Sequence, residues 1–143
     1  MTIDLVTSLI YVSRKTLSGS EGAADVENIL LVARERNKVL QVTGALFSAS
    51  STFAQFIEGS VSSIYQLMES IKRDPRHRDV KVVSVKDEVQ RKFPKWAMAY
   101  SGNQYYIDRH IGRLLDVPPP TNFAEWVEQL EALMEEFSKR IMD

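Results

Sequence analysis

The sequence has no cysteine among its 143 residues, which excludes disulfides, thiol nucleophiles and thiolate metal sites. Its 18 basic and 19 acidic side chains leave a formal net charge of −1, so the chain lacks a bulk field that would attract nucleic acid or an anionic membrane. No run approaches the roughly 18 apolar residues that span a bilayer, and no basic segment precedes the short apolar run near the N-terminus. We therefore expect a soluble, cytoplasmic protein that binds neither nucleic acid nor membranes.

Residues that carry catalysis are also scarce. His77 and His110 are the only two histidines, and neither has a serine or a carboxylate in a recognisable relation to it. Paired histidines, HExxH and EF-hand loops are absent, as are the phosphate-binding glycine patterns GxGxxG and GxxxxGKS/T. We expect no metal site, no standard nucleotide-binding fold and no enzyme active site.

Hydrophobic periodicity predicts the elements of the first 102 residues. Runs of β-branched and aromatic residues predict strands, and apolar residues at steps of three and four predict helices. In chain order the expected elements are strand 5–13, helix 25–37, strands 42–49 and 52–59, helix 61–72, strand 80–89 and strand 93–102. TLSGSEGAAD and DPRHRD are expected to be loops between them. The order βαββαββ, with two helices on one face of a mostly antiparallel sheet, is an α+β sandwich of the ferredoxin-like kind.

A C-terminal extension, residues 103–143, follows this domain of residues 1–102. Residues 105–115 are weakly helical, and the prolines 118–120 form a stiff spacer. Apolar residues then recur at steps of three and four from Phe123 to Ile141, which predicts an amphipathic helix. This helix either packs on the bare face of the domain's own sheet or joins a second subunit and makes a homo-oligomer.

Gln55 is the polar residue that does not fit its strand, FAQFIEG. Alternation places Phe53, Gln55 and Ile57 on one face of the strand, so the amide is expected to be buried. A buried amide without partners costs about 1–3 kcal/mol, so the fold should supply them. Tyr11 on the neighbouring first strand can donate its hydroxyl to the amide oxygen, which leaves the amide hydrogens for a ligand. Such a ligand would lie between the helices, flanked by Ile29 and Ile71.

Other polar or redox-relevant residues stand where a core prefers hydrocarbon. Asn37 is expected at the end of the first helix, where asparagine often takes the left-handed conformation. Trp96 and Met98 share one face of the last strand. Each also has an ordinary interpretation as a cap or a core residue. The charged stretch KRDPRHRDVK is either a solvated loop or a contact for the phosphates of a ligand.

Six motifs, in order, carry a resemblance to a known family. They are SLIYVSR, RERN, VTGALF, FAQFIEG, DPRH and KFPKWAM. With this spacing the chain resembles a BLUF domain, the flavin-binding blue-light sensor, over about residues 5–100. The match departs from the family's usual residues at Ser70, where a basic residue is common, and at Ala97, where serine is common.

The resemblance implies a photoreceptor that binds FAD, or else FMN or riboflavin, non-covalently between the two helices. Tyr11 would bond Gln55, and Gln55 would bond the flavin, which implies a photoswitch in which blue light makes the glutamine rotate or tautomerise. The family's pattern implies further flavin contacts by Ile29, Arg34, Asn37, Ile71, Asp74, Arg76 and His77.

The resemblance also implies an output. Trp96 and Met98 would pass the change to the C-terminal extension, and from there to a separate signalling protein or to a change of assembly. No substrate would be turned over. The alternatives are a ferredoxin-like phosphoryl-handling enzyme of the acylphosphatase type and a ligand-free interaction module built on the C-terminal helix.

Overall fold

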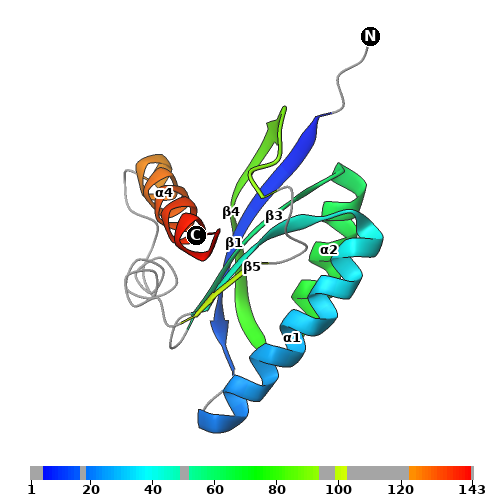
Figure 1. Cartoon of the computed structure of the whole chain (residues 1–143), viewed down its shortest axis with the longest axis vertical. Coiled ribbons are helices and arrows are strands. Elements are labelled where there is room, and N and C mark those ends of the chain that lie inside the picture. The colour runs from blue at the N-terminus through cyan, green and yellow to red at the C-terminus, as the bar shows by residue number, and fades with distance from the viewer. Residues whose placement is uncertain (1–4, 17–18, 49–51, 94–98, 103–122, 143) are drawn as a thin grey trace.

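The computed structural model describes residues 5–16, 19–48, 52–93, 99–102 and 123–142 (Figure 1). The elements are β1 Val6–Lys15, α1 Gly19–Leu40, β2 Thr43–Ser48, β3 Thr52–Gly59, α2 Val61–Arg73, β4 His77–Glu88, β5 Ala99–Gly102 and α4 Phe123–Met142. Their order confirms the predicted ferredoxin-like α+β architecture.

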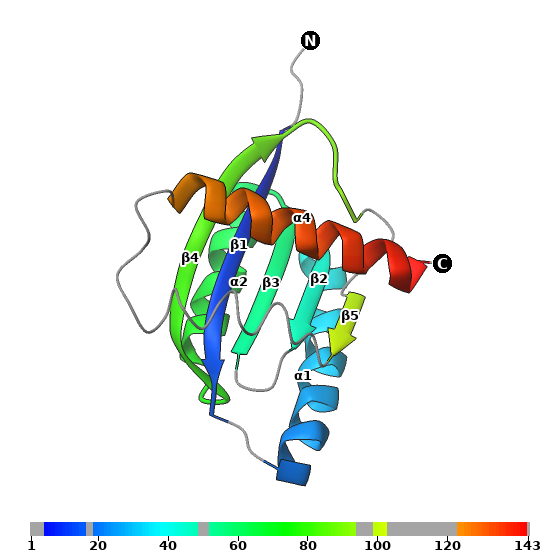
Figure 2. The same ribbon diagram turned by 90° about the vertical axis from the view of Figure 1, so that its left-hand side faces the viewer.

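One five-stranded sheet, in the order β4-β1-β3-β2-β5, forms the middle of the molecule. The pairs β4–β1, β1–β3 and β3–β2 are antiparallel, and β5 pairs in parallel with β2. Each of α1 and α2 connects two strands that have a third strand between them. Both helices lie on one face of the sheet (Figure 1), and α4 crosses the other face (Figure 2).

The two faces carry separate hydrophobic cores. Phe53 and Ile57 of β3 belong to the core under α1 and α2, whereas Ala54 and Phe56 belong to the core under α4. The predicted alternation along FAQFIEG is thus confirmed. It puts Gln55 on the helix-covered face.

α4 packs on the chain's own sheet. Val127, Leu130 and Met134 follow one another at steps of three and four, are buried, and join the core formed by β1, β2 and β3. Burying a side chain of this size stabilises the docked state by about 1.5–3 kcal/mol. Of the two predicted alternatives for this helix, the structure contains packing on the domain's own sheet.

α1 is longer at both ends than predicted. It begins at Gly19 instead of Asp25, because Glu21, Ala23 and Ala24 are good helix formers and each glycine costs only about 1 kcal/mol once a helix is nucleated. It ends at Leu40 instead of Asn37.

The end of α1 is a Schellman motif. Gln41 takes the left-handed conformation, with a φ of 57°, and donates its N–H to the Lys38 carbonyl. The Val42 N–H donates to the Asn37 carbonyl at 2.8 Å. Asn37 therefore lies inside the last turn of the helix, and the prediction that it occupies the left-handed position is wrong.

The predicted loop 74–79 is shorter in the structure. β1 continues to Lys15, two residues past its predicted end, and so offers pairing partners to the start of β4. Lys15 pairs with His77 and Arg14 with Arg78. The bulge that follows contains Asp79 at a φ of 55°.

Gly44 allows β2 to approach β3 closely. A Cβ atom there would lie 2.0 Å from the Phe56 carbonyl oxygen, so no other residue fits without a shift of the backbone. The pairing that follows places Leu46 opposite Gln55. The glycine of VTGALF thus helps to build the floor of the site described next.

Candidate functional site

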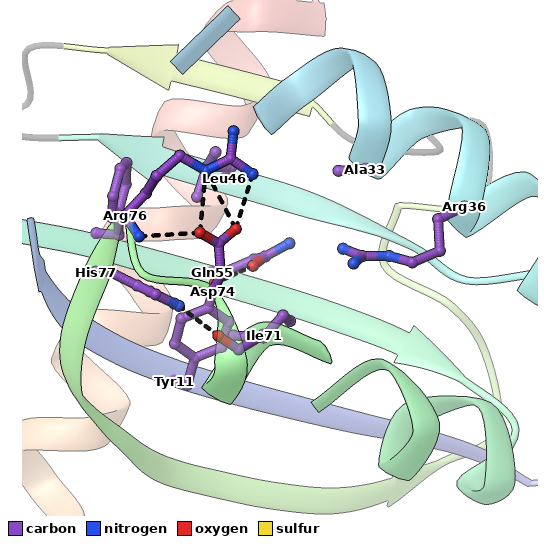
Figure 3. A pocket seen from close by; sticks show the side chains of 10 residues that line it. Tyr11, Ala33, Arg36, Leu46, Gln55, Ile71, Asp74, Arg76 and His77 are labelled. Atoms are coloured by element: carbon purple, nitrogen blue, oxygen red, sulfur yellow. Dashed lines mark hydrogen bonds and ion pairs between the residues drawn. The ribbon is translucent and has the colours of Figure 1, made fainter. Parts of the chain in front are cut away.

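A cavity lies between the helices and the sheet on the α1–α2 side. It is lined by residues from both helices, the three central strands and the turn after α2 (Figure 3): Tyr11, Ala33, Arg36, Leu46, Phe53, Gln55, Ile71, Asp74, Arg76 and His77. Half of these side chains are apolar or aromatic, and the other half are polar or charged groups that converge on the cavity. This is the usual composition of a small-molecule site.

Tyr11 and Gln55 lie directly opposite each other on β1 and β3. Both are buried, with exposed fractions of 4% and 5%. The Tyr11 hydroxyl donates a hydrogen bond to Oε1 of Gln55, which confirms the predicted contact. Burial raises the pKa of Tyr11 far above its ordinary value, so the hydroxyl stays protonated and keeps its role as donor.

The bond also orients the amide of Gln55. Because the oxygen is held toward Tyr11, the amide nitrogen forms the other end of the group. The side chain therefore presents an acceptor in one direction and a donor in the other. A half-turn about its last torsion would exchange the two.

The DPRH turn closes on itself and ties the two helices together. Asp74 caps the end of α2 and accepts hydrogen bonds from Arg76, through its backbone N–H at 2.9 Å and its Nη2 at 2.8 Å. The hydrogen bonds from Arg76 hold the pKa of Asp74 below its usual value. Nη1 of Arg76 reaches α1 and donates to Oδ1 of Asn28 at 3.0 Å.

His77 is held by hydrogen bonds at both ring nitrogens. Nε2 lies 2.6 Å from the Ile71 carbonyl oxygen and must donate to it, because a carbonyl only accepts. Nδ1 lies 2.8 Å from the hydroxyl of the buried Ser13, which donates to it when the ring is neutral. The ring also meets Tyr11 edge-on, with centroids 6.0 Å apart. These contacts fix one wall of the cavity beside Tyr11.

Arg36 belongs to the cavity, and sequence reasoning missed it. Its side chain points at the space between the helices and the sheet (Figure 3). Among the described residues, nothing accepts a hydrogen bond from its buried Nε. Burial lowers the pKa of Arg36, but arginine remains a cation. A buried donor of this kind is satisfied by a ligand with acceptor atoms.

Arg34 was predicted in this role and does not line the cavity. It lies on the exposed side of α1. Helical spacing could have identified the arginine that lines the cavity, because Arg36 is three positions from the buried Ala33, whereas Arg34 is only one. The contact of Arg34 with a flavin stays a prediction.

The other predicted contacts divide into three groups. Ile71, Asp74, Arg76 and His77 line the cavity together with Tyr11 and Gln55, and their contacts with a flavin stay a prediction. Asn37 is fully buried in the last turn of α1 but is not among the lining residues. The side chain of Ile29, and all of Trp96 and Met98, lie outside the described residues.

The described part of the chain shows no features of a metal-binding cluster or of a membrane-spanning helix. It contains no cluster of three or more side chains that could hold a metal ion. It also contains no helix that is both long and apolar enough to cross a bilayer.

Taken together, the fold and the site define a class: a ferredoxin-like domain with a cavity between its helices and its sheet, lined by apolar side chains and by converging polar groups. The comparison with known families makes this specific. The family model for BLUF, sensors of blue-light using FAD, matches residues 6–99. The chain therefore belongs to the BLUF family.

Curated relatives are similar over the same region. The photoactivated adenylate cyclase subunit beta of Euglena longa is 33% identical over 94 residues, which are 65% of this chain and 11% of that protein. The blue light- and temperature-regulated antirepressor BluF of Escherichia coli K12 is 30% identical over 94 residues, 66% of this chain and 23% of that protein. The chain thus matches about a tenth of the first protein's length and about a quarter of the second's.

Solved structures agree. The dark-state structure of BlrB, a BLUF protein, superposes with a TM-score of 0.73 at 28% identity, over 94% of this chain and 98% of that one. The photo-activated state of BlsA superposes with a TM-score of 0.74, over 91% of this chain and 94% of that one. Its identity is 21%, so this second likeness concerns the fold alone.

The residues of the cavity fit a flavin. The isoalloxazine ring is flat and apolar over its faces, with carbonyl oxygens and ring nitrogens along one edge. The apolar walls match its faces, and the donors of Gln55 and Arg36 match an edge rich in acceptors.

Proposed function

We propose that this chain is a photoreceptor module that holds FAD between α1 and α2, with Gln55 as its moving part. The observation that carries the proposal is the buried hydrogen bond from Tyr11 to Gln55 at the floor of the cavity. The bound flavin supplies the absorption of blue light and a transient acceptor for an electron and a proton.

The roles of the protein residues follow from their chemistry. Tyr11 is held protonated by burial and is the nearest donor to Gln55. When the electron distribution at the ring edge changes, the amide can present its other end by rotating or tautomerising. Because the amide is neutral in either orientation, exchanging its ends moves no net charge and costs little in solvation.

The outer rim of the cavity favours a flavin that carries phosphate. Asn28, Ser70, Arg73, Asp74, Pro75 and Arg76 line a shallow depression at the mouth between the helices. Asp74 already neutralises Arg76, which leaves Arg73 as the cation best placed for a phosphate. FMN and FAD should therefore bind more tightly than riboflavin, and Arg73→Gln should reduce that preference.

We further propose that the module, residues 1–102, turns over no substrate and that residues 103–143 carry the output. The described part of that extension, α4, covers the sheet face opposite the cavity. Its release or shift would expose an apolar surface to a separate signalling protein or to a second copy of the chain, in the cytoplasm.

Purified protein tests the proposal. A yellow preparation whose flavin absorption shifts slightly to the red under blue light, and recovers in the dark, is expected. Gln55→Leu should keep the flavin and lose the red shift, while Glu69→Gln, an exposed change on α2, should keep both. A colourless protein that takes up no added flavin contradicts the proposal, and a normal photocycle in Gln55→Leu contradicts the role of the glutamine.

A phosphoryl-handling enzyme is less well supported by the geometry. It would need an arginine and an asparagine converging on a phosphate pocket. Arg34 is exposed and Asn37 is fully buried, so this pair does not converge.

A further inference from the structure

Glu58 is a buried carboxylate on the sheet face opposite the cavity. It lies on β3, three residues after Gln55, and its exposed fraction is 0%. Because the separation is odd, the two side chains leave the strand on opposite faces. An isolated buried carboxylate is costly, so its partners reveal what it holds.

Those partners are mostly backbone groups from the segment that follows β4. Oε2 of Glu58 accepts from the Lys92 N–H at 2.8 Å, and Oε1 accepts from the Phe93 N–H at 2.6 Å. The Thr43 hydroxyl adds a third bond at 3.2 Å. The carboxylate therefore fixes the backbone of residues 92 and 93 to β3.

Arg91 reinforces the same attachment. Its Nη1 donates to the Glu58 carbonyl oxygen at 3.1 Å, and its Nη2 donates to the Gln41 carbonyl oxygen at 2.7 Å. Residues 91–93, which we name the clasp, are thus bound to β3 and to the end of α1 by both backbone and side-chain bonds.

The side chains of the clasp bind α4. Nζ of Lys92 lies 2.5 Å from a carboxylate oxygen of both Glu131 and Glu135. The aromatic ring of Phe93 packs edge-on against Phe56, with centroids 5.1 Å apart, in the core that contains Leu130. Figure 2 shows α4 lying across β1, β3 and β2, which contribute side chains to this core.

We propose that Glu58 is a positioning residue that couples the strand of Gln55 to α4 through the clasp. The proposal rests on the proposed photoreceptor function. A displacement of β3 caused by the glutamine reaches Glu58 three residues later, moves two backbone N–H groups, and is passed by Lys92 and Phe93 to the docked helix. The clasp also leads directly into the segment that contains Trp96 and Met98.

The test compares Glu58→Gln with Glu69→Gln in the flavin-loaded full chain. An amide at position 58 keeps the size of the side chain, but replaces one acceptor oxygen by a donor that faces a backbone N–H. Two readouts are taken: the light-induced red shift, and amide hydrogen exchange of peptides from residues 123–142 in darkness and in light.

We expect light to change the exchange of these α4 peptides at least twofold in the unaltered protein. Glu58→Gln should keep the red shift, exchange roughly 10- to 100-fold faster in α4 already in darkness, and lose the difference between light and dark. Glu69→Gln should behave like the unaltered protein. Lys92→Met leaves the backbone bonds of the clasp in place, so a smaller increase in exchange and a reduced light response are expected.

Three results would overturn the proposal. One is a red shift in the unaltered protein without any change of exchange in α4. Another is exchange in Glu58→Gln that rises equally in α1 and α2, because Glu58 would then stabilise only the fold. If Glu58→Gln does not fold, Lys92→Met tests the proposal in its place. The third overturning result is then a light response of the α4 peptides in Lys92→Met that equals that of the unaltered protein. Failure of the proposed function looks different, since the unaltered protein would then show no red shift.

Discussion

Replacing Tyr11 by phenylalanine removes one oxygen atom and leaves the ring in place against His77. The buried oxygen of Gln55 then loses its donor, which costs about 1–3 kcal/mol in the free energy of unfolding. For a chain of 143 residues this corresponds to a fall of roughly 3–8 °C in Tm. Gln55→Leu strands the tyrosine hydroxyl instead and should cost a similar amount.

The double variant separates this bond from other effects. With phenylalanine and leucine together, both partners of this hydrogen bond are absent and neither is stranded by loss of the other, so the combined loss should be smaller than the sum of the single losses by about 1–2 kcal/mol. Urea unfolding of all four proteins, repeated at several flavin concentrations so that the contribution of ligand binding can be subtracted, measures the difference.

Additive losses, to within about 0.5 kcal/mol, would refute the reasoning, because residues that share a buried hydrogen bond cannot behave as independent sites. The photocycle gives a second check on the same proteins. Tyr11→Phe should retain flavin and lose the normal red shift.

Three further changes have expected outcomes. Arg36→Met should weaken flavin binding about tenfold or more in a fluorescence titration, because a charge-assisted hydrogen bond is lost. Arg34→Met, the control, should leave the affinity unchanged. Equal effects of the two substitutions would exclude Arg36 as a flavin contact. Burial alone would raise the pKa of Glu131, but the hydrogen bonds from Lys92 and Lys86 outweigh it and the pKa is lowered. The contribution of this carboxylate to α4 docking is therefore present above pH 4.5 and is lost as the pH falls through the pKa of Glu131 in the folded protein. Acid should release α4 in the unaltered protein, and Lys92→Met should show a smaller acid dependence. Identical pH profiles of α4 hydrogen exchange in the two proteins would contradict this. Gly44→Ala should lower the thermal midpoint by more than about 5 °C, and an unchanged midpoint would show that β2 can move away from β3.

Elements whose pattern is set by one buried face were predictable. The alternation along FAQFIEG was sufficient to place Gln55 under the helices and Phe56 on the other side, because a strand offers only two faces. The ferredoxin-like order then makes β1 and β3 neighbours, which brings Tyr11 to Gln55. The amphipathic helix α4 was also predictable from the spacing of its apolar residues. The surface on which it packs was not, because that surface is formed by the sheet.

Errors arose where the deciding contact is distant or made by the backbone. The end of α1 is one such place, because the helix continues past Asn37 to a left-handed residue that is a glutamine and not a glycine. Glu58 was not singled out because two of its three partners are backbone N–H groups 34 and 35 positions away. No side-chain pattern in a sequence marks such donors.

β1 is synthesised before both of the strands that pair with it. Tyr11 meets Gln55 at a sequence separation of 44 residues, and the other edge of β1 is completed by β4. Both strands that flank β1 arrive after a helix, so the centre of the sheet forms by long-range closure, which slows folding. Until residues 123–142 have left the ribosome, the apolar face formed by Ile10, Phe47 and Phe56 lacks the cover that α4 gives it. Expression of the domain without α4 should therefore favour aggregation during synthesis, even where the finished sheet is stable.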